Sequence, residues 1–246
     1  MNVKAFWFLL GGILLGGGCS EENSIPLTKG NLSTETRSLE NFNTITVSQK
    51  FKLVLSYNLN EPVSARIEFY ENLTKNIQLK IENGRLTLKD NNKLKWLRDL
   101  DIQPVVFLNL HQLNTLNIEG SSEVFCADTL FGDVLEIAMN SSKNSMLNIH
   151  YNTVMGGSKN VGGITLSGKG TIFSWSCENG GWFDARNMAC HDAYIWHFTK
   201  SDCWVSPEKQ LQFNLYNTGN LYYLDRLFFY KKEINASGKG AAIPYN

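Results

Sequence analysis

The stretch His197-Phe-Thr-Lys-Ser-Asp-Cys203 is one of seven similar heptads that decide the fold of this chain. Each heptad opens and closes on a residue of the inward-facing type, and the five positions between are mostly small or polar. The other six are Ile118-EGSSE-Val124, Met139-NSSKN-Ser145, Met155-GGSKN-Val161, Cys177-ENGGW-Phe183, Leu215-YNTGN-Leu221 and Ala236-SGKGA-Ala242. Successive first positions differ by 21, 16, 22, 20, 18 and 21 residues. A nearly constant step of this size is typical of stacked repeat folds.

The residues that flank the heptads alternate between apolar and polar. Apolar side chains recur at every second position in three such flanks, which are Leu135/Ile137/Met139, Ala193/Ile195/His197 and Leu211/Phe213/Leu215. A period of two predicts strands with one buried face. Each unit is then strand, tight turn, strand, and neighbouring coils must stack because one coil cannot bury its own face. An antiparallel sandwich with hairpins at similar spacing is the alternative.

The composition describes a globular chain without a strong charge preference. The 246 residues include 43% hydrophobic and 19% charged side chains, and the net charge is zero. This balance argues against nucleic acid or an acidic membrane surface as the main partner. The length suffices for one or two domains.

The N-terminus has the features of an export signal. Lys4 precedes an apolar stretch from Ala5 to Leu15, which is too short to span a bilayer as a mature helix. Three glycines and Cys19 follow, and this arrangement resembles a bacterial lipoprotein lipobox, although Gly16 stands where leucine is usual. We therefore expect a signal peptide over 1–18 and a lipid on Cys19 that attaches the chain to a membrane. A plain secretory peptide with an incidental cysteine is the alternative.

Two segments separate the signal from the repeats. Residues 19–39 are polar without periodicity and predict a loose tether; their start, Ser20-Glu21-Glu22, resembles the acidic signal of surface-exposed Bacteroidetes lipoproteins. Residues 40–113 predict several strands, and Asn83-Gly84 is a strong two-residue hairpin signal. We expect 40–113 to start the stack and cover its open end, because an uncovered coil would expose strand edges. Residues 114–246 form the solenoid repeats.

Longer stretches of the chain resemble a known family. They are "NFNTITVSQKFKLVLS" near the start, "IEFYENLTKNIQLKIENGRLTL" after it, and "DAYIWHFTKSDCWVSPEKQLQFNLYNTGNLYYLD" in the repeats. Over roughly residues 40 to 245 they resemble the putative auto-transporter adhesin, head GIN domain family, whose members are commonly Bacteroidetes lipoproteins. The resemblance implies an all-β, right-handed β-solenoid, a pectin-lyase-like β-helix without that class's catalytic residues. It also implies a role in cell adhesion.

The cysteines after Cys19 are Cys126, Cys177, Cys190 and Cys203. We expect them to be unpaired, inward-facing and packed as small apolar groups. Cys177 opens one heptad and Cys203 closes another, which places them in different columns of the stack. Cys190 with Cys203 is therefore the pair to examine for a disulfide bridge.

Metal and catalytic chemistry find little support in the sequence. The spacing of Cys190, His191, His197 and Cys203 matches no known ligand motif, so we expect no metal and no other cofactor. His197 falls at an inward position, which predicts a core histidine bonded to the backbone. The charges are scattered, Asp184 and Arg186 share one face at most, and no nucleophile elbow, phosphate loop or His-Glu-x-x-His motif is present. We expect no enzyme.

Aromatic residues fall at outward positions around one heptad. If Ala193, Ile195 and His197 point inward, then Tyr194, Trp196, Phe198 and Trp204 point outward. Such rings would form a flat surface for sugar rings or a protein partner. Tyr194, Trp196 and Trp204 are thus the candidate ligand-binding residues. The alternative is that the stretch from Arg226 to Lys232 covers them, with Tyr222, Phe228, Phe229 and Tyr230 as the covering side chains.

The sequence therefore favours a non-catalytic, lipid-anchored outer-membrane protein of the cell envelope. It would present a β-solenoid for adhesion, with a glycan or a cell-surface protein as partner. A periplasm-facing structural scaffold and a carbohydrate-active β-helix enzyme are the alternatives. Protease treatment of intact cells separates surface from periplasmic exposure, and a glycan array separates binding from scaffolding.

Overall fold

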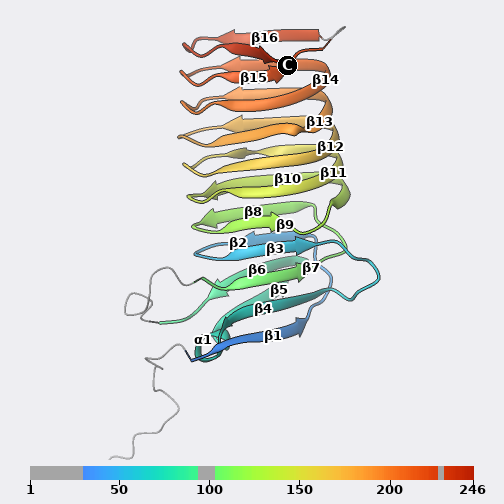
Figure 1. Ribbon diagram of the computed structural model, residues 1–246, viewed down its shortest axis with the longest axis vertical. Helices are drawn as coiled ribbons and strands as arrows, with labels where there is room; N and C mark the ends of the chain where they lie inside the picture. Colours follow the sequence, from blue (N-terminus) through green and yellow to red (C-terminus); the bar gives the residue numbers. More distant parts are fainter. Residues whose placement is uncertain (1–29, 94–102, 227–229) are drawn as a thin grey trace, which may run out of the picture.

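The computed structural model describes residues 30–93, 103–226 and 230–246, and it is a column of stacked β-coils (Figure 1). Five long strands bend around the side of the column opposite the turns, so that one half leaves a turn and the other half enters the next. They are β10 (Leu130–Ser141), β11 (Ser145–Ser158), β12 (Gly163–Cys177), β13 (Trp182–His197) and β14 (Cys203–Leu215). Shorter strands complete the column above and below them: β8 (Thr115–Gly120), β9 (Glu123–Cys126), β15 (Leu221–Leu224), β16 (Tyr230–Ala236) and β17 (Ala242–Tyr245).

The coils pair in parallel, and each pairing joins equivalent halves. The half of a long strand that runs into a turn pairs with the equivalent half in the next coil, as Ala193 does with Leu211. Halves that leave a turn pair with leaving halves, as Cys203 does with Leu221. The inward side chains of both sets form one core. The predicted fold class, an all-β solenoid with two packed layers, is confirmed.

Three surfaces of the column are named here. The entry face is the outward surface of the strand halves that run into the turns, and the exit face is the outward surface of the halves that leave them. The turn edge is the stack of turns that joins the two faces. Because the chain reverses direction at each turn while inward residues share one core, the two faces point to opposite sides.

Six of the seven heptads fall on the turns as predicted, and the third does not. The strand register aligns Met139 with Ser158 and Ser158 with Cys177, so the third turn unit runs from Ser158 to Ile164. Met155, predicted to point inward, lies on the entry face and is exposed. The glycines of this region explain the error. Gly156 and Gly157 look like turn residues but lie within β11, where they allow close approach to the neighbouring strands.

The order of coils in the column differs from their order in the chain. The coil of β2 (Thr44–Val47) and β3 (Lys52–Ser56) lies between two later coils. One of these consists of β6 (Arg85–Asp90) and β7 (Val105–Asn109), and the other consists of β8 and β9. The chain therefore forms its first coil, runs to the end of the column, and returns to both sides of that coil.

Antiparallel strands form the end of the column nearest the N-terminus. β4 (Ser64–Tyr70) pairs antiparallel with β7 and with β1 (Leu32–Ser38), and β5 (Ile77–Glu82) pairs antiparallel with β6. The predicted Asn83-Gly84 hairpin turn joins β5 to β6, with φ of 50° and 72° at its two residues. The division between a 40–113 segment and a 114–246 segment stays a prediction.

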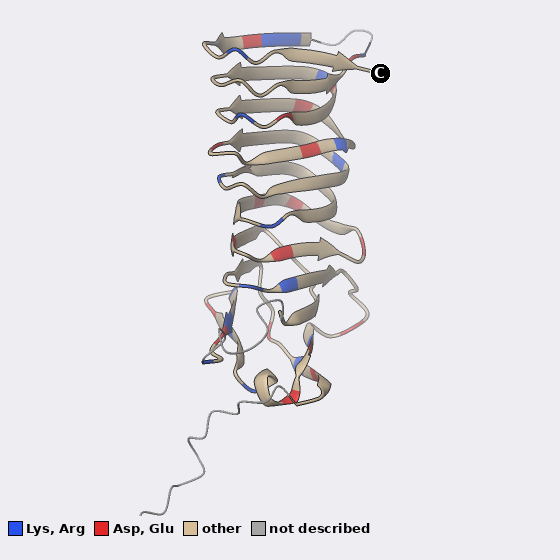
Figure 2. Cartoon of the chain, turned by 60° about the vertical axis from the view of Figure 1, so that its left-hand side comes forward, with Lys and Arg blue, Asp and Glu red and all other residues tan. Residues whose placement is uncertain are grey.

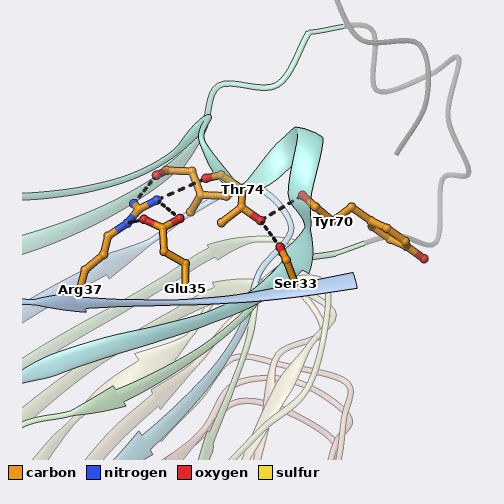
Figure 3. Close-up of polar contacts among 6 residues, drawn as sticks. Ser33, Glu35, Arg37, Tyr70 and Thr74 are labelled. Atoms are coloured by element: carbon orange, nitrogen blue, oxygen red, sulfur yellow. Dashed lines mark hydrogen bonds and ion pairs between the residues drawn. The ribbon is translucent and has the colours of Figure 1, made fainter. Parts of the chain in front are cut away.

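Polar contacts hold β1 against α1 (Glu71–Thr74) and the start of β5, as Figure 3 shows. Arg37 Nη1 donates to the Ile77 carbonyl at 2.6 Å and Nη2 donates to the Thr74 carbonyl at 3.3 Å. The same guanidinium donates to both carboxylate oxygens of Glu35, which lowers the pKa of that carboxyl. Ser33 Oγ donates to the Phe69 carbonyl.

Within the described ranges, no helix is long and apolar enough to cross a membrane.

Candidate functional site

Trp196 belongs to a column of outward residues on the entry face that is otherwise made of small or amide side chains. Strand pairing gives the order Ala138, Gly157, Ser176, Trp196 and Asn214. The indole is 39% exposed, and Tyr194 in the next column is half-buried. In the part of the chain that the structure describes, no ring, cation or hydrogen-bond partner lies against Trp196.

A hollow of about 420 Å³ lies next to Trp196 on the same face. It spans three coils because the outward positions at Ala138 and Gly157 carry little or no side chain. Its lining consists of Glu136, Ile137, Ala138, Asn140, Met155, Gly156, Gly157, Lys159, Ser176 and Glu178. Ser176, which lines the hollow, pairs directly with Trp196 on the neighbouring strand, and the two backbones are one strand spacing, about 4.8 Å, apart.

Glu136 lines the hollow away from the turns, and the other polar groups lie toward its turn-edge side. Ser176 Oγ donates to Glu178 Oε1 at 3.3 Å, and Lys159 Nζ lies 3.8 Å from the same oxygen. Asn140 from the coil below contributes an amide. A carboxylate, an ammonium group, a hydroxyl and an amide can each bond to ligand hydroxyls. An aromatic ring beside such groups is suited to the apolar face of a sugar or to a polar peptide.

Trp204, the third predicted site residue, lies on the opposite face. It is an outward residue of the exit face, where its neighbours along the column are Asp184 and Tyr222. The Trp204 and Tyr222 rings stack with centroids 5.2 Å apart and an interplanar angle of 10°, and Arg186 Cζ lies 4.9 Å from the indole centroid. The prediction of one continuous surface with Tyr194 and Trp196 is wrong, because the turn at residues 198–202 sends Trp204 to the other side of the coil.

The residues predicted to cover Tyr194, Trp196 and Trp204 do not form one covering surface in the described part of the chain. Tyr222 covers one side of Trp204, and Tyr230 at the start of β16 is itself 54% exposed. Phe228 and Phe229 lie outside the described residues, as does Cys19. Phe198 stacks on Tyr216 at the turn edge, with ring centroids 4.3 Å apart. Of the three predicted site residues, Trp196 alone combines an exposed ring with a neighbouring hollow.

The hollow was not predicted from the sequence. Gly157 and Ser176 occupy outward positions in adjacent coils, but the third heptad was placed three residues too early. That register concealed the alignment of the small residues in one column. The usable signal was the pair Gly162-Gly163, which marks the true turn.

Positively and negatively charged residues are both distributed along the column, as Figure 2 shows. On the exit face, Asp184 and Arg186 form an ion pair with a 2.5 Å contact. The hydrogen bond to Asp184 raises the pKa of the Arg186 guanidinium. Both groups are thus engaged with each other. In the described ranges, no group of three or more His, Cys, Asp or Glu side chains has the geometry to hold a metal ion.

Cys177, Cys190 and Cys203 are buried and Cys126 is partly buried, and one pair of these cysteines is in contact. Cys203 Sγ lies 3.7 Å from Cys177 Sγ across the core at the turn edge, whereas Cys190 Sγ lies 3.8 Å from the Ser206 carbonyl. The four cysteines are unpaired in the structure, as expected, but Cys190 and Cys203, the pair singled out for a disulfide bridge, are not the pair in contact. Cys177 and Cys203 lie in different columns, as predicted, but they are in contact because the two columns face each other across a thin core. His197 is a core residue, but neither ring nitrogen has the predicted backbone partner.

Comparisons with known proteins agree with this architecture. The family model described as putative auto-transporter adhesin, head GIN domain, matches residues 41–226. Among curated proteins, no sequence match to this chain is found.

Solved structures share the fold at low sequence identity. A putative adhesin from Bacteroides fragilis superposes with a TM-score of 0.78 at 18% identity, covering 87% of this chain and 97% of that one. A putative adhesin from Parabacteroides merdae has a TM-score of 0.63 at 19% identity, with 88% and 97% covered. A putative lipid binding protein from Parabacteroides distasonis has a TM-score of 0.63 at 17% identity, with 87% and 97% covered.

Proposed function

The chain belongs to the putative auto-transporter adhesin, head GIN domain family, and from this membership we propose that it is a non-catalytic adhesin of the cell envelope. The family and its solved relatives support an adhesion-type role. We assign ligand contact to the entry face, at Trp196 and the adjoining hollow.

The observation that carries the assignment is the unpartnered, exposed indole beside a hollow. An exposed tryptophan contributes little to the core, because burial of apolar surface is what stabilises the fold. A large apolar ring next to a concave region with few polar groups is the usual composition of a binding site. The hollow offers a carboxylate, an amide, an ammonium group and a hydroxyl within three coils. These features favour a glycan, with a polar segment of a surface protein as the second candidate.

The test compares the two tryptophans. Full-length protein carrying Trp196→Ala should lose most of its retention on a glycan array and most of its adherence to cells. Trp204→Ala is the matched control, since it removes the same side chain from the opposite face. Retention that survives Trp196→Ala, or that disappears equally in both variants, would contradict the assignment to the entry face.

The position of the protein in the envelope rests on the sequence of residues 1–22. We propose that Cys19 is the mature N-terminus, that it carries lipid, and that it anchors the chain to the outer membrane. Cys19→Ser should move the protein from the membrane fraction to the soluble fraction or block its processing. Cys126→Ser is the control, because it removes a thiol outside the signal. Membrane association unchanged by Cys19→Ser would remove the lipid anchor while leaving the entry-face proposal intact.

A further inference from the structure

Cys177, Cys203 and His197 form a buried cluster at the turn edge that adhesion does not use. The three residues have relative exposures of 0%. Cys177 opens one turn unit, His197 opens the next and pairs with Cys177 along the column, and Cys203 closes the unit that His197 opens. The cluster thus joins two consecutive coils across the core.

The geometry points to a disulfide cross-link between Cys177 and Cys203. Their sulfurs are 3.7 Å apart, whereas a disulfide bond is about 2.05 Å long, so side-chain rotation of less than 2 Å brings them together. No comparable approach joins Cys190 to another sulfur in the described chain; its thiol faces the Ser206 carbonyl. The bond would close one complete coil, residues 178–202, into a loop.

His197 is the third member of this cluster. Both ring nitrogens of His197 are buried without a hydrogen-bond partner. Burial of an unpaired polar group costs free energy of folding. Burial by itself raises the pKa of Cys203, but the Cys177 thiol and the His197 imidazole outweigh burial and lower that pKa to about 6. Burial raises the pKa of Cys177, so Cys203 is the more acidic thiol of the pair.

The step needs a disulfide oxidant, R–S–S–R, such as the oxidised glutathione used below. The Cys203 thiolate attacks one sulfur and releases RS⁻, which takes up the proton that Cys203 has lost and leaves as RSH. Cys177 then loses its proton to solvent and, as a thiolate, attacks the Cys203 sulfur of the mixed disulfide. The second RS⁻ takes up a proton from solvent and leaves as RSH. Two S–H bonds break, one internal S–S bond forms, and two electrons reduce the oxidant to two thiols.

Burial sets when the cross-link forms. A folded coil shields both sulfurs from an oxidant, so the bond forms while the last turns are still open, as in an exported chain that folds in an oxidising compartment. Its effect is local, because Ser176 and Trp196 immediately precede Cys177 and His197. The cross-link would fix the coil that ends the hollow to the coil that carries Trp196.

Peptide mapping tests the cross-link directly. The full chain is refolded with oxidised glutathione, its free thiols are alkylated in denaturant, and it is digested with trypsin without reduction. Cleavage after Lys169, Arg186, Lys200 and Lys209 separates the cysteines into peptides 170–186, 187–200 and 201–209. We expect 170–186 linked to 201–209, with 187–200 alkylated. Three alkylated peptides, or a link that includes 187–200, would overturn the proposal.

Thermal unfolding gives a second measurement. The oxidised chain should melt roughly 5–10 °C above the reduced chain, because a loop of this length restricts the unfolded state. The difference should vanish in Cys203→Ala and persist in Cys190→Ala. If the variants fail to fold, the wild-type peptide map still decides. Thiols that stay protected only until a chelator removes bound zinc would identify a metal site instead and overturn the disulfide.

Discussion

Trp196 and Trp204 are eight residues apart and both point out of the solenoid, yet their surroundings differ completely. Trp204 lies between an arginine and a tyrosine from the coils on either side of it. Trp196 has a serine on one side and an asparagine on the other, and a hollow beyond the serine. The Trp204 ring on the exit face therefore contacts residues of both neighbouring coils, whereas the Trp196 ring on the entry face is exposed beside small neighbours.

The difference teaches how a two-layer solenoid separates stability from binding. Parallel in-register pairing aligns equivalent outward side chains along a column. Aromatic and cationic neighbours in such a column form a ladder that stabilises the stack, as Asp184, Arg186, Trp204 and Tyr222 do. Small neighbours leave a concave surface instead. The side chain one coil away, more than the tryptophan itself, decides which of the two results.

The largest effect is expected at Gly219, because the turn edge sets how the two faces are joined. A Cβ at Gly219 would lie 2.2 Å from the Ser201 carbonyl oxygen and 2.7 Å from His197 Cε1. Gly219→Val should therefore lower the free energy of unfolding by about 1–3 kcal/mol, as chemical denaturation would measure. Thr218→Val, at the exposed neighbouring position, is the control. Equal stability of both variants would show that the turns do not pack as described.

Gly219 is needed for space and not for its φ. The glycines with positive φ in the described chain are Gly30, Gly84, Gly120, Gly168 and Gly180. The heptads thus require glycine for two different reasons: Gly120 and Gly180 take the left-handed region, as Asn179 also does, whereas Gly219 provides space.

A smaller loss is expected for Trp204→Ala on the exit face. Removal of the ring abolishes its stacking on Tyr222 and its contact with Arg186, which should cost about 1–2 kcal/mol. Calorimetry would measure the loss, and ligand retention should remain at the wild-type level. Retention lost together with stability would mean that the exit face also binds, and the comparison of the faces would fail.

Arg186→Gln isolates the cationic part of the same ladder. The Arg186 side chain is 48% exposed and that of Asp184 18% exposed, so solvent partly screens the pair and the expected loss is about 1 kcal/mol. The loss should shrink further as salt is raised, because screening weakens exposed pairs. Denaturation at low and at high ionic strength measures both values. A salt-independent loss would indicate that packing of the arginine stem, and not its charge, supports Trp204.

The smallest effect on stability is expected for Trp196→Ala. With the ring exposed and unpartnered, the change should stay within about 0.5 kcal/mol, as for a surface position. The same denaturation experiment measures it beside Trp204→Ala. A cost of several kcal/mol would show that Trp196 is covered by another segment, and the binding assignment would then be wrong.

The sequence by itself determined the repeat, the strand parity and the hairpin. Alternation at Leu135, Ile137 and Met139 was sufficient to predict which side chains enter the core, because neighbouring residues in a strand always point to opposite sides. The Asn83-Gly84 pair predicted its turn for a local reason as well, since few other residues accept positive φ twice in succession. Family membership was also predicted, and the family model confirms it.

Only the tertiary structure decided the relations between coils. Backbone hydrogen bonds between parallel strands carry no sequence information, so nothing local revealed that the coil of β2 and β3 lies between two later coils. The pairing between coils also decided three further features. They are the register of the third turn, the separation of Trp196 from Trp204 onto opposite faces, and the contact of Cys177 with Cys203. Local pattern sets the direction of each side chain, whereas the path of the chain between strands sets which side chains it meets.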